Sequence, residues 1–344
     1  MRINNTQGLI LPNKKDEEFL KINFDPLFSY DFKEHKTYKL EISELKTIED
    51  TSSYESLLFD VTRSIDKTKK VLTINKDTTE PIFIIHTIKE DEIFFTNSVK
   101  IELKENVKAQ IVEVFISSSK NSAYSVNRTF ELAKNSNLEY VKIQDFDNSN
   151  SFIYNTFISQ EESSNIDFSN FEYGDGFILN TFINNINNKN ITYNLNGLVK
   201  LNNDATCSNL IKTVHTAQNS LSNINYKHSL KDSSKAVFKA KSRVLQTALF
   251  TKAFQNTNTI LLSDDATIFA QPHLEIYIDE LEASHGATTG SLDKEQLLYL
   301  QTRGIPKDLA YDMLLKAFEE KIVNNIKDVT IKEFIQNYKK EKYV

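Results

Sequence analysis

The sequence predicts a mainly β protein, built as a right-handed parallel β-helix with a mixed segment before it and a small helical domain after it. Three observations lead to this fold class. Apolar and polar residues alternate through the middle of the chain, short polar clusters recur there at intervals, and helical spacing replaces the alternation near the C-terminus. We expect an N-terminal mixed or helical segment over 1–55, the β-helix over 56–290 and the helical domain over 291–344.

The alternation is clearest in the run LEIYIDEL at 274–281, where Leu274, Ile276 and Ile278 share one face. A period of two is typical of a half-buried strand. Similar strands follow polar clusters in KENVKAQIVEV, AKNSNLEYVKI and DSSKAVFKAKS, with starts roughly 25–45 residues apart, as in a solenoid whose coils cover one another. A β-sandwich is the alternative, but only 7 glycines and 5 prolines in 344 residues disfavour many tight hairpins.

Helical signals lie at both ends of the chain. The run at 13–22 has Asn13 or Asp16 as a possible N-cap and acidic residues early, which predicts a helix there. Near the C-terminus, Asp293 can cap a helix that starts at Lys294 and ends before Gly304. The proline at 306 suits the first turn of a second helix.

Composition excludes several classes of protein. A net charge of −6 argues against a nucleic-acid surface, and no apolar run is long enough to span a membrane. The N-terminus lacks the pattern of a signal peptide, so we expect a cytoplasmic protein. The single cysteine, Cys207, cannot form an internal disulfide or hold a zinc ion or a cluster by itself, and we expect it to be buried.

Motifs of self-contained catalysis are missing from the sequence. It has no Walker loop, no G-x-S-x-G elbow and no H-E-x-x-H or C-x-x-C pattern. Its six histidines are scattered, and no two share helical ligand spacing. Self-contained catalysis therefore has little support in the sequence.

One histidine stands in an unusual context, the stretch SHGATTG at 284–290. We expect this stretch to join the last strand to the first C-terminal helix, with Gly286 and Gly290 as structural turn residues. His285 between them could present a ring nitrogen to iron or to a partner's thiolate. The alternative is that the glycines turn the corner and the histidine is incidental.

The residues from 259 to 305 resemble the C-terminal signature of the SufB/SufD family of iron–sulfur cluster assembly scaffolds. The shared features are LLSDDA, the P-x-LEI strand, SHGAT and the helix QLLYLQTRGI. The run at 11–27 resembles the family's N-terminal element, with Phe19 where Trp is usual, and 214–241 resembles the strand before the signature. Residues 60–200 resemble the family only in their general pattern and share no specific motif with it. The stretch SHGATTG at 284–290 and the lack of a cysteine after Cys207 resemble the SufD branch of the family. One difference is Ala283, which stands where SufD often has Cys.

The resemblance implies a non-enzymatic scaffold that pairs with a SufB-like subunit through the β-helix and binds a SufC-like ATPase through the C-terminal helices. It implies that His285 lies at the interface with the SufB-like subunit and handles iron or a nascent cluster there. No cofactor is expected to bind tightly to the isolated chain. A homodimer is possible when the chain is alone.

The expected contacts with the ATPase lie on the first C-terminal helix and the turn after it, where an arginine stands beside apolar anchors, a common composition of binding hot spots. These residues are Leu297, Leu300, Arg303, Gly304 and Ile305.

Three rival functions remain at this point. A SufB-like subunit that itself builds clusters is disfavoured by the missing cysteine near His285. A β-helix module acting on polysaccharide usually stacks sugars on tryptophan, and the chain has none. A purely structural partner of the ATPase, with no metal role, stays open.

Overall fold

A computed structural model describes the chain except for residues 7, 14, 41, 43, 44, 55, 148 and 344. The predicted domain boundary after residue 55 therefore falls on a residue outside the described part. The helical elements are two 3-10 turns (Ile3–Asn5 and Glu17–Phe19), α1 (Asp25–Phe28), α2 (Leu58–Arg63), α3 (Lys294–Thr302), α4 (Lys307–Val323) and α5 (Val329–Tyr343). None of the described helices is both long and apolar enough to cross a membrane.

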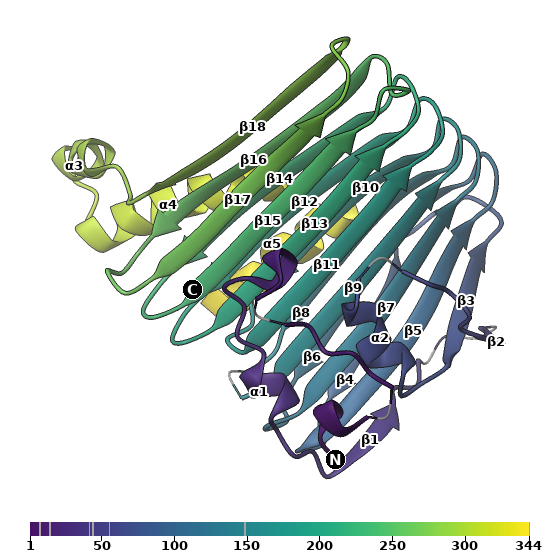
Figure 1. Ribbon diagram of the computed structural model, residues 1–344. Helices are drawn as coiled ribbons and strands as arrows, with labels where there is room; N and C mark the ends of the chain where they lie inside the picture. Colours follow the sequence, from purple (N-terminus) through teal and green to yellow (C-terminus); the bar gives the residue numbers. More distant parts are fainter. Residues whose placement is uncertain are drawn as a thin grey trace.

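Most of the chain between α2 and α3 is extended (Figure 1). The strands are β1 (Glu34–Thr37), β2 (Lys46–Glu49), β3 (Thr68–Ile74), β4 (Ile82–Ile88), β5 (Ile93–Leu103), β6 (Lys108–Ser117), β7 (Ala123–Leu132), β8 (Asn137–Asp145), β9 (Ser151–Gln160), β10 (Asn165–Glu172), β11 (Phe177–Ile186), β12 (Thr192–Leu201), β13 (Thr206–His215), β14 (Leu221–Leu230), β15 (Lys235–Val244), β16 (Thr251–Leu261), β17 (Thr267–Ile276) and β18 (Leu281–Gly290).

From β3 onward the strands alternate between two sheets, so each coil gives one strand to each sheet. The first sheet has the order β17-β15-β13-β11-β9-β7-β5-β3-β2, with β1 also against β5, and the second has the order β18-β16-β14-β12-β10-β8-β6-β4. Neighbours from β3 onward pair in parallel, with partners roughly 30 residues apart in sequence, as in Ser151 with Phe177 and Lys235 with Thr267. The predicted parallel β-helix is confirmed, and the sandwich alternative is wrong.

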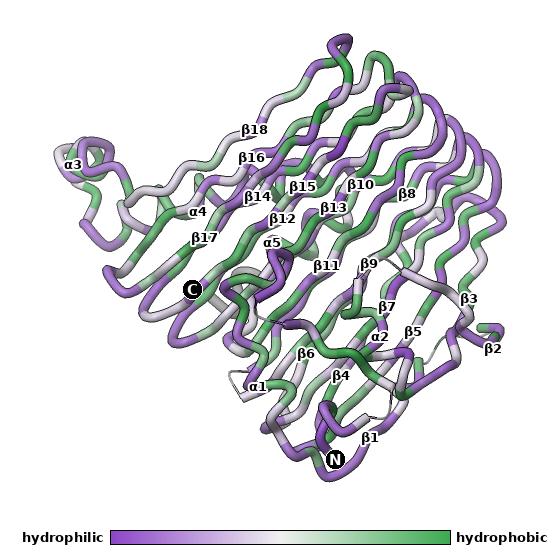
Figure 2. Tube along the Cα trace, viewed as in Figure 1, coloured by the Kyte–Doolittle hydropathy of each residue, from purple (hydrophilic) through white to green (hydrophobic). Residues whose placement is uncertain are grey.

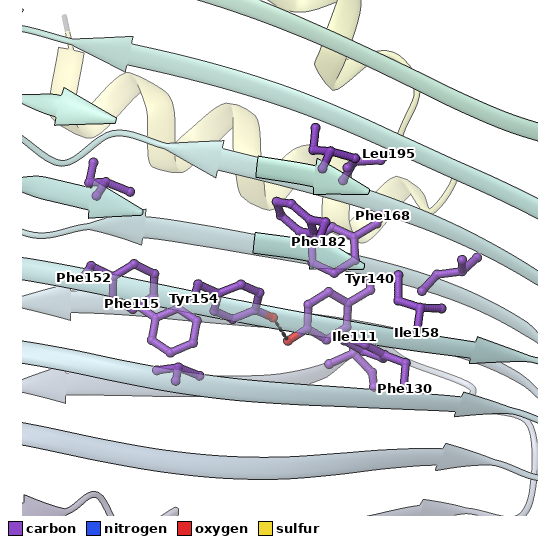
Figure 3. Packing of buried hydrophobic residues seen from close by; sticks show 14 of the residues in the cluster. Ile111, Phe115, Phe130, Tyr140, Phe152, Tyr154, Ile158, Phe168, Phe182 and Leu195 are labelled. Carbon is purple, nitrogen blue, oxygen red and sulfur yellow. Dashed lines mark hydrogen bonds between the residues drawn. The ribbon is translucent and has the colours of Figure 1, made fainter. Parts of the chain in front are cut away.

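The space between the two sheets holds the main core. Every second residue of a strand faces it, which gives the alternating hydropathy along the strands in Figure 2. Aromatic rings from both sheets meet there, and Figure 3 shows Phe115, Phe152, Tyr140 and Phe168 among them. The ring centroids of Phe115 and Phe152 are 4.9 Å apart, as are those of Tyr140 and Phe168. This close packing between coils stabilises the solenoid.

The corners of the coils explain how the chain turns with so few glycines. At many corners one residue adopts the left-handed conformation, and asparagine, the residue other than glycine that tolerates it best, is the usual choice. These corner residues have φ between 54° and 62°, and they are Glu92, Asn106, Asn121, Asn135, Ser163, Asn190, Asn203, Asn219, Asp232 and Phe250.

The ends of the chain cover the outer faces of the sheets. The N-terminal segment and α2 pack on the first sheet, where Phe24, Leu27 and Leu58 share an apolar cluster with Phe94 and Leu179. The predicted helix over 13–22 is wrong. The described residues of this run form a 3-10 turn at Glu17–Phe19 and no α-helix, because Phe19 is buried against the sheet and tertiary packing overrides helix propensity.

The C-terminal helices lie across the outer face of the second sheet (Figure 1). Ile322 at the end of α4 and Ile331 and Ile335 of α5 share one apolar cluster with Val141 and Leu198 of the sheet. Glu139 of β8 accepts hydrogen bonds from the backbone N–H groups of residues 327 and 328, between the two helices. The buried apolar residues described at the end of α4 and in α5 therefore share their core with the outer face of the β-helix.

A buried lysine lies beneath α4. Lys227 of β14 is only 6% exposed, and its Nζ lies 3.8 Å from the centroid of the Phe318 ring. Burial, together with the nearby Lys321, lowers its pKa to about 8. Lys200 of the adjacent strand β12 lies two residues beyond Leu198, the register partner of Lys227. It instead has a carboxylate partner, with Nζ 3.5 Å from Glu319.

We expect Lys227→Met to stabilise the chain at pH 7, by about 1 kcal/mol after allowance for solvent screening, because it removes a buried charge. The folded pKa lies below the unfolded one, so wild-type stability should rise between pH 8 and 10.5. The variant should lack that rise. Urea unfolding at pH 7 and at pH 9.5 measures both effects. Lys200→Met should instead destabilise the chain, because it breaks the pair with Glu319. An equal loss in free energy of unfolding in the two variants would contradict this account.

Candidate functional site

The C-terminal end of the β-helix is uncovered. Among the described strands, β17 bonds only to β15 and β18 only to β16, so each presents a free edge. Residues that face the interior are buried on the earlier coils but exposed or half-buried on these last two strands. Unpaired backbone groups and exposed apolar side chains at a sheet edge form a ready docking surface for another chain.

His285 lies in the middle of β18, at this open end. It pairs in register with Gln255 of β16, which in turn pairs with Ile224 of β14. Paired residues of neighbouring parallel strands point to the same face, and Gln255 and Ile224 are buried between the sheets. His285 therefore continues an interior column, but it is exposed because no further coil covers it.

The ring of His285 is oriented by the opposite strand. Its Nδ1 lies 3.1 Å from the carbonyl oxygen of Pro272 in β17. A carbonyl oxygen can only accept, so Nδ1 carries the proton and donates, which leaves the lone pair on Nε2. A histidine that donates one ring N–H to a backbone carbonyl and keeps the other nitrogen free is arranged as metal-binding histidines usually are.

Pro272 suits this position because of the free edge. The backbone N–H of Tyr277 donates to Val244 of β15, and that of Thr267 donates to Ser234, directly before β15. Residues at the alternate positions therefore direct their N–H groups away from that strand. A proline at 272 removes no hydrogen bond of the sheet there, and its carbonyl is free to accept from His285.

The structure corrects the predicted turn. Gly286 and Gly290 lie within β18, and their register with β16 continues through the pair of Gly290 with Ile260. Neither glycine has a positive φ. The prediction failed because glycine usually breaks a strand, whereas on an edge strand without an outer neighbour it leaves no gap in the packing.

The other candidate ligands lie elsewhere. His86, His215 and His228 are fully buried, and burial lowers the pKa of His215 to about 4 and that of His228 to about 3. Cys207 is buried as predicted, and burial raises the pKa of its thiol. The described residues contain no group of three or more histidine, cysteine, aspartate or glutamate side chains placed to hold a metal.

Helix α3 forms the second candidate surface. Asp293 caps it as predicted, with Oδ1 accepting from the N–H groups of residues 295 and 296. Gly304, with φ of 85°, ends it as predicted. The N–H of Ile305 bonds to the carbonyl of Leu300, and the N–H of Gly304 to that of residue 301, which is a Schellman motif. Leu300, Gly304 and Ile305 therefore have a structural role within the helix end.

The most exposed apolar residues of this surface differ from the predicted contacts. Leu297, Leu300 and Ile305 are half-buried, whereas Leu298 and Tyr299 are 61% and 58% exposed. Arg303 is exposed and stacks on the ring of Tyr299, with Cζ 5.3 Å from the ring centroid. In α4, Leu309 and Met313 are also exposed. The sequence does contain a signal for this exposure. Residues 297–300 form an apolar run of four, and one helix face cannot bury all four side chains.

Comparisons with known proteins agree with this architecture. The family model "SUF system FeS cluster assembly, SufBD core domain" matches residues 86–318. The iron-sulfur cluster assembly protein SufD of Escherichia coli is 28% identical over 236 residues, which cover 68% of this chain and 55% of that protein. SufD of Bacillus subtilis is 34% identical over 97 residues (28% and 22%), and the chloroplastic protein ABCI7 of Arabidopsis thaliana is 34% identical over 108 residues (31% and 23%).

The aligned part thus spans about half the length of the Escherichia coli relative and less than a quarter of the other two. The region matched by the family model covers the β-helix from β4 to β18, the open end with His285, and most of the α3–α4 surface. With this match over most of its length, the chain belongs to the SufBD core family of the SUF iron–sulfur cluster assembly system.

Proposed function

We propose that the chain is a non-enzymatic, SufD-like scaffold subunit of a SufBCD-type iron–sulfur cluster assembly complex. It pairs with a SufB-like subunit through the open end of the β-helix and binds a SufC-like ATPase through α3 and α4. The observation that carries the proposal is the position of His285, which stands at the uncovered end with Nδ1 bound to Pro272 and Nε2 free.

Iron or a nascent cluster is the cargo in this proposal. The Nε2 of His285 supplies one ligand, and one ligand is far from a full coordination shell. A partner chain docked on β17 and β18 would bring thiolate or carboxylate ligands to the same edge. The single cysteine, Cys207, lies buried within the β-helix, which favours a SufD-like role over a SufB-like one.

Co-purification with SufB-family and SufC-family subunits from the same genome tests the proposal. We expect a complex that retains all three chains and binds iron, whereas the isolated chain should bind iron weakly or not at all. Sedimentation of the isolated chain would show whether its open end pairs with a second copy. Failure of either partner to co-purify would contradict the proposal.

The α3–α4 surface makes a separate prediction. Leu298→Asp should weaken association with the ATPase at least about tenfold, because it places a charge in the centre of an apolar contact without disturbing the fold. Arg303→Glu should weaken it as well by reversing the charge beside Tyr299. Titration of the ATPase against each variant, by calorimetry, measures the effect.

Val329→Asp provides the matched control for Leu298→Asp. Val329 is an exposed apolar residue at the start of α5, away from α3, and an acidic residue is well tolerated at a helix N-terminus. This variant should bind the ATPase like the wild type. Unchanged binding in both Leu298→Asp and Arg303→Glu would remove α3 from the interface.

A further inference from the structure

One corner of the β-helix departs from the pattern of the others. In the connections that lead from the first sheet to the second, the left-handed residue is polar at five corners: Asn106, Asn135, Ser163, Asn190 and Asn219. At the sixth, between β15 and β16, it is Phe250, with φ of 59°. Asparagine tolerates this conformation, and its side chain can bond to the corner of the preceding coil, as Asn135 donates to Asn106 at 3.0 Å. Phenylalanine has no such compensation, so its backbone is strained.

Packing within the chain does not explain the phenylalanine. The side chain of Phe250 is 59% exposed, so burial does not account for an aromatic residue at this strained position. The backbone is nevertheless held firmly, because its N–H donates to the carbonyl of Glu280 at 2.8 Å and the carbonyl of Leu249 accepts from Asn219 at 2.9 Å. The corner therefore presents an aromatic ring to solvent from a fixed backbone.

The location of this corner connects it to the open end. The bond to Glu280 ties Phe250 to the connection between β17 and β18, the last corner before the free edge. Ile276, the last residue of β17, and Tyr277, the first of that connection, are also exposed, and Arg243 lies over the Tyr277 ring at 5.3 Å. Aromatic residues and arginine together are the usual composition of binding hot spots.

We propose that Phe250 is a rim anchor of the open end, which inserts its ring into an apolar pocket of the SufB-like β-helix subunit that docks there. The inference rests on the proposed function and adds a specificity-determining residue to it. A residue that is strained, exposed and rigidly held beside a docking edge gains its contacts only in the complex. Strain of this kind persists where binding requires it.

The test separates stability from binding. Phe250→Asn should raise the Tm of the isolated chain by about 1–3 °C, because asparagine relieves the backbone strain. The same variant should raise the Kd for the SufB-family subunit about tenfold or more, because the anchor is lost. Calorimetry of the isolated chain and titration with the purified SufB-family subunit measure the two effects.

Asn219→Phe is the matched control, because it places the same strained phenylalanine one corner earlier. It should lower the Tm by a similar amount and leave the Kd unchanged. If Phe250→Asn bound the partner as tightly as the wild type, or lowered the Tm, the anchor proposal would be overturned while the proposed function stood. If the wild-type chain itself failed to bind the SufB-family subunit, the proposed function would fail, and the anchor with it.

Discussion

His285→Ala is expected to lower cluster formation by the assembled complex at least about tenfold while leaving the complex intact. The side chain is exposed on an edge strand and contributes little to the core, so folding and subunit association should change little. Loss of Nε2 removes the metal ligand that we propose for this chain at the open end. Even the loss of a group that only orients a metal ligand lowers metal affinity or activity ten- to a hundredfold. Reconstitution of the complex with iron and sulfide, followed by absorbance and iron analysis, measures the effect.

His273→Gln serves as the control, because this histidine is also exposed but lies on the outer face of β17, 3.7 Å from Glu275. His215→Gln tests a buried histidine, whose Nε2 lies 2.8 Å from Ser222. Neither variant, once folded, should lose cluster formation. If His285→Ala supported assembly as well as the wild type, the histidine would have no role as a ligand and the open end would serve for pairing alone.

The sequence predicts the solenoid well because its signal is repeated on every coil. Alternation and polar corners recur through the middle of the chain, so an error on one strand does not change the fold. The sequence does not reveal that asparagine replaces glycine at the corners, because Asn135 or Asn190 looks like any polar loop residue until its φ is known. The packing of the chain ends on the outer faces is also hidden, since it depends on residues far apart in sequence.

The candidate site is predicted in part. The sequence singles out His285 by its neighbours but places it in a turn, whereas β18 is a regular edge strand. Its hydrogen bond to Pro272 and its place in the column above Gln255 depend on the registers of both sheets. The prediction of contacts on α3 is limited in the same way, because helical spacing does not say which side of α3 the nearby α4 covers.

The sequence pattern also does not reveal a buried network of charged side chains near the start of the β-helix. Arg128 donates to the Glu113 carboxylate through Nε at 3.0 and 3.1 Å and through Nη2 at 2.6 Å. His86 lies 2.7 Å from the same carboxylate, and Tyr140 donates to it as well. All four side chains are fully buried. Burial would raise the pKa of Glu113, but Arg128 and His86 outweigh it and hold this pKa well below its usual value.

Arg128→Met is therefore expected to lower the free energy of unfolding at neutral pH by about 3–5 kcal/mol, because it leaves a buried carboxylate without its main counter-charge. Glu113→Leu combined with Arg128→Met should recover much of that loss, since no uncompensated charge remains. Urea unfolding of the purified variants measures both. Lys134→Met, which breaks a surface pair with Glu162 at 3.1 Å, should change stability little.

The pH dependence identifies the cause of the loss. In the wild type the folded pKa of Glu113 lies below the ordinary value of 4.5, so its contribution is present above that pH and is lost only as the pH falls toward the folded pKa. Without Arg128, burial raises the folded pKa of Glu113, and the folded variant takes up a proton. The loss in free energy of unfolding caused by Arg128→Met should therefore be largest near pH 8 and smaller at pH 5. A deficit that stayed constant between these values would mean that lost packing, and not the unpaired carboxylate, destabilises the variant.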